Sequence, residues 1–239
     1  MAIKPADNEA FYREVDEELR RAQLTGYWQR YGKSLVAGAV LLLLLLAGVL
    51  YWQHRQEKKA GEQAEQLNAI FDDLQVNKVK EVGPRLDTLA KEGTPGYQAA
   101  ALLTKADIAL GEGRDAEAIK GFKAVAENDD FAEPYRQLAL IRQTAAEYEK
   151  LQPQAVIDRL KGLAVAGNPW FGSAGEMVAI AYMKQGKPQL AGPIFAAMAK
   201  DAQLPDTVRS RAVQMAGSLG IDAVPDTETG GAAATKDAQ

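Results

Sequence analysis

The distribution of apolar positions divides the chain into two parts. Between residues 34 and 52 the sequence has nineteen consecutive uncharged residues, with six leucines at positions 41–46. Beyond residue 54, apolar residues recur every three or four positions among charged ones, and Gly or Pro interrupts this pattern at intervals. The first pattern predicts one helix that is apolar on all sides. The second predicts a series of amphipathic helices.

The uncharged run has the properties of a membrane span. At a rise of about 1.5 Å per residue it covers roughly 28 Å, close to the thickness of the hydrocarbon core of a bilayer. We therefore predict one transmembrane helix at residues 34–52 rather than a buried helix of a soluble protein. Aromatic residues, which are favoured at the depth of the lipid headgroups, flank the run on both sides: Tyr27, Trp28 and Tyr31 before it, and Tyr51 and Trp52 at its end.

The residues before the run favour an uncleaved anchor over a cleaved signal peptide. Residues 1–33 carry six acidic and six basic side chains, whereas a signal peptide begins with a short basic segment. No small-x-small cleavage site follows the leucines, and the chain has no cysteine for lipoprotein processing.

The flanking charges predict the orientation of the anchor. Four basic residues lie shortly before the run and three lie shortly after it: Arg20, Arg21, Arg30 and Lys33, then Arg55, Lys58 and Lys59. Because basic residues are retained on the cytoplasmic side, residues 1–33 are predicted to form a charged cytoplasmic tail. The C-terminal part is then predicted to lie outside the cytoplasm.

The amphipathic part repeats itself. A motif of three apolar residues, spaced by four and then three positions, occurs four times at intervals of 36, 38 and 35 residues. Its copies are Val82, Leu86 and Leu89; Ala118, Phe122 and Val125; Val156, Leu160 and Leu163; and Ala191, Phe195 and Met198. A turn or helix breaker precedes each copy, and another amphipathic helix precedes each turn. The apolar residues of these first helices are Leu67, Phe71 and Leu74; Leu102, Ala106 and Ala109; Leu138, Ala145 and Tyr148; and Val178, Ala179 and Tyr182.

A helix-turn-helix unit that recurs at about 34 residues is the pattern of tetratricopeptide repeats. The predicted fold class is therefore all-α: a single N-terminal transmembrane helix, then a tetratricopeptide-like α-solenoid of about four helical hairpins at residues 55–220. A helix at about 206–219 is predicted to cap the stack. From residue 221 to 239 the apolar periodicity is lost, which predicts a disordered tail. A generic helical bundle is the alternative.

No residue pattern predicts catalysis. One histidine and no cysteine do not suffice for the usual zinc sites or for a triad of nucleophile, histidine and acid. The glycines at 111–113 lack the rest of a phosphate-binding loop, and the segment 172–175 lacks the spacing of a nucleophile elbow. The net charge of −4 disfavours nucleic-acid binding. The sequence thus predicts no enzyme activity, no cofactor and no metal site.

A solenoid without such chemistry is suited to binding other proteins along the groove lined by the first helix of each hairpin. Candidate partner-binding residues are those on first helices that the predicted core does not use: Asp107, Arg142, Glu149, Glu176 and Lys184. Trp170 and Phe171 are added as an aromatic pair before the fourth repeat. At least one of these two is expected to pack in the core, and the other to be an exposed anchor.

Three features together resemble a known bacterial family. They are the segment WQRYGK at 28–33, the anchor that ends in YWQ at 51–53, and the degenerate repeats. They are similar to the ancillary subunit family of the SecYEG translocon (YfgM-like proteins), although the long acidic N-terminal tail and the Ala/Thr-rich tail from Ala223 depart from it. The resemblance implies a type II inner-membrane protein whose repeats face the periplasm. Its implied partners are SecYEG and a membrane-anchored periplasmic chaperone. The alternative is a scaffold for another envelope machine, such as cell division or cytochrome and respiratory assembly.

Overall fold

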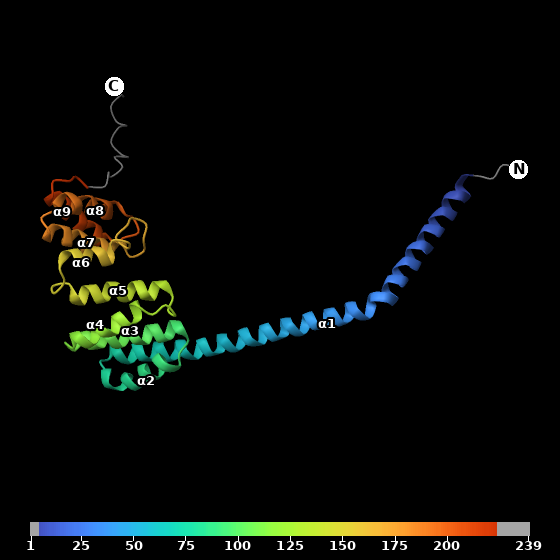
Figure 1. The fold of residues 1–239 in the computed structure, drawn as a ribbon, viewed down its shortest axis with the longest axis horizontal. Coiled ribbons are helices and arrows are strands. Elements are labelled where there is room, and N and C mark those ends of the chain that lie inside the picture. Colours follow the sequence, from blue (N-terminus) through green and yellow to red (C-terminus); the bar gives the residue numbers. More distant parts are fainter. Residues whose placement is uncertain (1–4, 224–239) are drawn as a thin grey trace, which may run out of the picture. The chain divides into compact units, whose positions relative to one another are not determined.

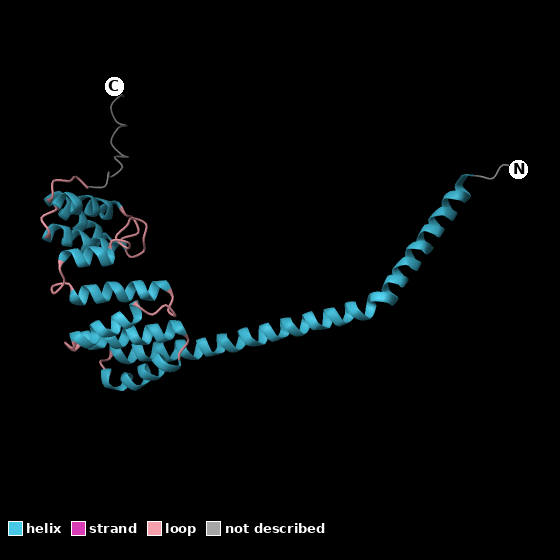
Figure 2. Ribbon diagram, viewed as in Figure 1, coloured by secondary structure: helices cyan, strands magenta, loops and turns pink. Residues whose placement is uncertain are grey.

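The structure is a computed structural model that describes the backbone of residues 5–223 and the side chains of residues 31–223. Every regular element within these residues is a helix (Figure 2), so the predicted all-α class is confirmed. The helices, labelled in Figure 1, are α1 (Pro5–Gln75), α2 (Val79–Glu92), α3 (Pro95–Gly111), α4 (Asp115–Ala126), α5 (Glu133–Glu147), α6 (Pro153–Leu160), α7 (Phe171–Lys184), α8 (Pro188–Lys200) and α9 (Asp206–Ser218).

The chain divides into two compact units, Met1–Glu62 and Gln63–Gln239. The first unit consists of α1 up to Glu62 and contains the predicted span. This helix is long and apolar enough to cross a membrane, and none of the side chains in its most apolar stretch is buried within the described residues. Leu44, in the centre of the leucine run, is 67% exposed. The exposed apolar surface is what a helix surrounded by lipid presents.

The second unit is a stack of helical hairpins (Figure 1). The end of α1 pairs with α2, and the following pairs are α3 with α4, α5 with α6, and α7 with α8. All twelve residues of the repeated second-helix motif are buried. Phe122 and Phe195, at equivalent positions of the second and fourth hairpins, are 0% and 1% exposed. The core therefore follows the stack as successive apolar clusters within and between hairpins.

The turns of three hairpins need a residue in the left-handed region. Gly113 and Gly186 adopt φ values of 75° and 70° in the second and fourth hairpins, where a side chain would be strained. Asn77 does so at 63° in the first, because Asn tolerates this conformation better than most residues. In the third hairpin Pro153 begins α6 without such a residue.

Two predicted core positions on first helices are wrong. Phe71 is 41% exposed, and its neighbour Ile70 is fully buried instead. Ala145 is exposed, while Thr144 is buried and donates its hydroxyl hydrogen bond to the Leu140 carbonyl. Successive helical residues point about 100° apart, so a small rotation of the helix about its axis decides which of two neighbours faces the core.

The last helix closes the stack as predicted, and the packed chain continues beyond it. Ala212 and Ala216 on α9 are buried in the last apolar cluster. Ile221 and Ala223, both in the predicted disordered tail, pack against the same cluster, and Ala223 is 1% exposed. A Cβ atom at Gly192 would overlap the end of the Ile221 side chain, so a larger residue there would require that side chain to move. Residues 224–239, the remainder of the predicted tail, lie outside the described residues.

Candidate functional site

The charged residues predicted to bind partners are already paired with one another or with the next repeat. Arg142 on α5 donates a hydrogen bond from Nη1 to Oδ1 of Asp107 on α3, at 2.9 Å. Lys184 on α7 donates from Nζ to Oε1 of Glu149, two residues after the end of α5, at 3.2 Å. The structure thus brings four of the five charged candidates together as two ion pairs.

The fifth candidate forms a third pair of the same kind. Glu176 on α7 accepts a hydrogen bond from Nη2 of Arg211 on α9 at 2.8 Å. The partners in each pair are 35 residues apart and belong to successive hairpins or to the last hairpin and the capping helix. We call these three contacts the inter-hairpin ion pairs. Sequence reasoning missed Arg211, although opposite charges recurring at the repeat interval are the signal that would have found it.

These pairs lie at the surface. The side chains of Arg142 and Asp107 are 50% and 40% exposed, and pairs of this kind contribute about 0–1 kcal/mol to stability. Partial burial raises the pKa of Asp107, and the positive charge of Arg142 opposes that rise. Because each acid faces a base, this face of the first helices is polar and locally neutral.

The two aromatic candidates have different surroundings. Phe171 is 2% exposed and packs in the last apolar cluster, which corrects its inclusion among the partner-binding residues and confirms that one of the pair belongs to the core. Trp170 is half-buried at the start of α7, and its Nε1 donates a hydrogen bond to Oε1 of Gln137 on α5 at 2.8 Å. Trp170 therefore joins two hairpins and presents only part of its ring to solvent.

A second contact between the same hairpins involves Tyr148. Its hydroxyl donates to the carbonyl oxygen of Met177 on α7 at 3.1 Å, and Nζ of Lys184 lies 4.6 Å from the centre of its ring. A cation at this distance is attracted to the ring face. Burial, with a smaller effect of the Glu149 charge, raises the pKa of the Tyr148 hydroxyl, so it remains a hydrogen-bond donor at neutral pH.

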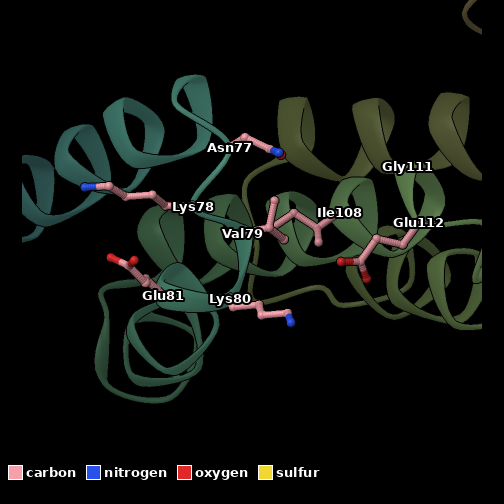
Figure 3. Close-up of a pocket in the computed structure, with 8 residues that line it drawn as sticks. All are labelled: Asn77, Lys78, Val79, Lys80, Glu81, Ile108, Gly111 and Glu112. Atoms are coloured by element: carbon pink, nitrogen blue, oxygen red, sulfur yellow. The ribbon is translucent and has the colours of Figure 1, made fainter.

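The structure also contains a pocket that the sequence did not predict. It lies between the turn after α1, the first residues of α2 and the end of α3, and its volume is about 640 Å³ (Figure 3). We call it the α2–α3 pocket. It is lined by Asn77, Lys78, Val79, Lys80, Glu81, Ile108, Gly111 and Glu112.

The charged candidates form a polar surface of ion pairs. Within residues 31–223, no group of three or more His, Cys, Asp or Glu side chains is placed to hold a metal ion. The inter-hairpin ion pairs are partly or largely exposed, and in each of them an acid is matched by a base.

The family comparison agrees with the repeat architecture. Residues 25–216 match the model of a tetratricopeptide repeat-like domain. The chain belongs to this family. The match covers the apolar stretch of α1 as well as all four hairpins. Comparison with curated proteins and with solved structures finds no significant match. Repeat domains of this family are in general protein-interaction scaffolds without catalytic activity.

Proposed function

We propose that this tetratricopeptide repeat-like protein is a membrane-anchored interaction module that acts as an ancillary subunit of the SecYEG translocon. In this proposal it is a type II protein of the bacterial inner membrane, with its repeats in the periplasm. There it binds partners or clients at the exit of SecYEG and links them to a membrane-anchored periplasmic chaperone. The translocon and the chaperone are proposed as partners because residues 28–33 and 51–53 resemble the corresponding segments of that family.

One observation supports the proposal that the repeats are anchored to a membrane. The apolar stretch and the first helix of the first hairpin belong to the same helix, α1. A repeat domain attached in this way is confined near the membrane. Confinement raises its effective concentration for any chain that emerges beside it. Contacts of micromolar affinity or weaker are then sufficient, and they permit release.

The proposed docking face is the side of the first helices that carries the inter-hairpin ion pairs. Asp107, Arg142, Glu149 and Lys184 are each at least 40% exposed there, and Glu176 is 27% exposed. Because these charges are compensated, a partner does not need an excess of one charge to bind. It can exchange individual ion pairs for contacts of its own.

Crosslinking in living cells tests this proposal. A photoreactive amino acid is placed at Ala145 on α5 and at Ser173 on α7, two exposed positions on first helices. The matched control is Lys120, an exposed position on the second helix α4. We expect adducts with translocon subunits or a periplasmic chaperone from the first two positions and not from the control. Adducts with only cell-division or respiratory-assembly proteins would instead support the scaffold alternative.

A further inference from the structure

The α2–α3 pocket contains one positive charge that is not compensated. Lys80, in the first turn of α2, forms no ion pair among the residues that the structure describes. Figure 3 shows its side chain extending toward the side of the pocket on which Glu112 lies. Lys80 is also one of the residues that line the pocket.

Of the other charged residues that line the pocket, Lys78 and Glu112 are each paired with a neighbour, and Glu81 points away from Lys80. Nζ of Lys78 lies 3.3 Å from Oδ1 of Asp73, and Glu112 accepts a hydrogen bond from Nη2 of Arg114 at 2.6 Å. Glu81 extends to the opposite side from Lys80, on the side of Lys78 (Figure 3). Among the lining residues that the structure describes, Lys80 is thus the base without an ion pair, in contrast to the compensated inter-hairpin ion pairs.

An apolar surface lies beside this charge. Val79 and Ile108 both line the pocket and are drawn next to each other, above Lys80 in the view of Figure 3. Ile108 packs on the apolar cluster of the first hairpin, which holds this wall in place.

We propose that the α2–α3 pocket binds a segment of a partner protein in which an apolar side chain lies next to a carboxylate. The apolar side chain contacts Val79 and Ile108, and the carboxylate pairs with Lys80. The volume of about 640 Å³ admits one or two side chains of an exposed peptide segment. This inference rests on the proposed function and deepens it, since it names the chemistry by which the interaction module recognises part of its partner.

The test uses the full chain in lipid nanodiscs and fluorescent peptides of eleven residues. The peptides have a Gly-Ser background with Leu-Glu, Leu-Gln or Ala-Glu at the centre, and binding is measured by fluorescence anisotropy. We expect the Leu-Glu peptide to bind about fivefold or more tightly than either of the other two, because each lacks one of the two contacts. Equal affinity of the Leu-Glu and Leu-Gln peptides, or no binding by any of them, would overturn the proposal.

A charge reversal makes the test specific for the pocket. In Lys80→Glu the preference should invert, so that a Leu-Lys peptide binds more tightly than the Leu-Glu peptide. Folding should be preserved, because an acidic residue in the first turn of a helix is favourable; circular dichroism checks this. Lys120→Glu, on α4 and away from the pocket, should leave the Leu-Glu preference unchanged. An unchanged preference in Lys80→Glu would also overturn the proposal.

The two proposals fail independently. The peptide measurement uses purified protein and needs no translocon. Crosslinking from Ala145 and Ser173 does not involve residues of the pocket. Loss of peptide preference with intact translocon adducts would reject only the pocket, and the converse would reject only the translocon role.

Discussion

Arg142 on α5 and Asp107 on α3 are 35 residues apart in sequence, and their side chains meet at 2.9 Å. The same interval separates Lys184 from Glu149 and Arg211 from Glu176. A charge pattern that recurs at the period of the repeat therefore links successive hairpins at their surface. The apolar clusters beneath these pairs supply most of the stabilisation, since exposed ion pairs contribute little.

Separating Arg142 from Asp107 should have a small effect on stability. We predict that Arg142→Ala lowers the free energy of unfolding by less than about 1 kcal/mol, because both side chains are half-exposed. Urea unfolding of the single variants and of the double variant Asp107→Ala/Arg142→Ala gives the coupling between the two residues. A coupling of several kcal/mol would show that the pair is buried in solution.

Removing a core phenylalanine should have a large effect. Phe122→Ala and Phe195→Ala should each lower the free energy of unfolding by about 3–5 kcal/mol, because each leaves a cavity in the apolar core. The matched control is Phe71→Ala. Because Phe71 is 41% exposed, this variant should lower the free energy of unfolding much less. Urea unfolding followed by circular dichroism compares the three. Similar losses in all of them would contradict the hairpin packing.

Asp73 should make stability depend on acidic pH. Hydrogen bonds from Arg85, at 2.6 Å, and from Lys78 lower the pKa of Asp73 below its ordinary value of 3.8. Because the folded state favours the carboxylate, this contribution is present above the ordinary pKa and is lost as pH falls through the lowered one. Asp73→Asn should therefore lose less stability on acidification than the native chain.

The measurement for Asp73 is urea unfolding from pH 6 to acid, with Asp72→Asn as the control. Asp72 is the exposed neighbour of Asp73 and takes part in none of these hydrogen bonds. If both variants followed the same pH profile, the ion pair with Arg85 would not contribute in solution.

A charge in the leucine run should weaken membrane insertion. We predict that Leu43→Arg reduces the membrane-bound fraction after carbonate extraction, because an arginine at the bilayer centre is unfavourable by about 2.5–3.5 kcal/mol. Leu190→Arg, at an exposed leucine of α8, is the control and should remain in the membrane fraction. Unaltered extraction of both variants would indicate that residues 34–52 do not span the membrane.

The proposed orientation is tested separately with spheroplasts. Protease added from outside should degrade the repeats and leave the N-terminal tail protected, because the basic residues before the span favour a cytoplasmic tail. Immunoblotting with tags at either end detects the fragments. Protection of the repeats, with loss of the tail, would reverse the proposed topology.

The sequence by itself determined the features that depend on periodicity. Val82, Leu86 and Leu89, and their equivalents in the later hairpins, were recognisable because a helix packed on one side repeats its apolar positions every three or four residues. The uncharged run at residues 34–52 was recognisable because a helix in lipid needs an unbroken apolar stretch of that length. Both patterns are local, and neither requires knowledge of which helices become neighbours.

Only the tertiary structure decided how each helix is rotated and which charges meet. Ile70 rather than Phe71 faces the core because two adjacent apolar residues both fit the periodicity, and packing against α2 selects one of them. In the sequence, Asp107 and Arg142 are charged residues on separate predicted helices, and nothing indicates that they interact. They pair because the stacking of hairpins brings Nη1 of Arg142 to 2.9 Å from Oδ1 of Asp107. The α2–α3 pocket likewise forms where residues 77–81 meet the end of α3. Because these two segments are separate in the sequence, a local pattern could not predict that they meet.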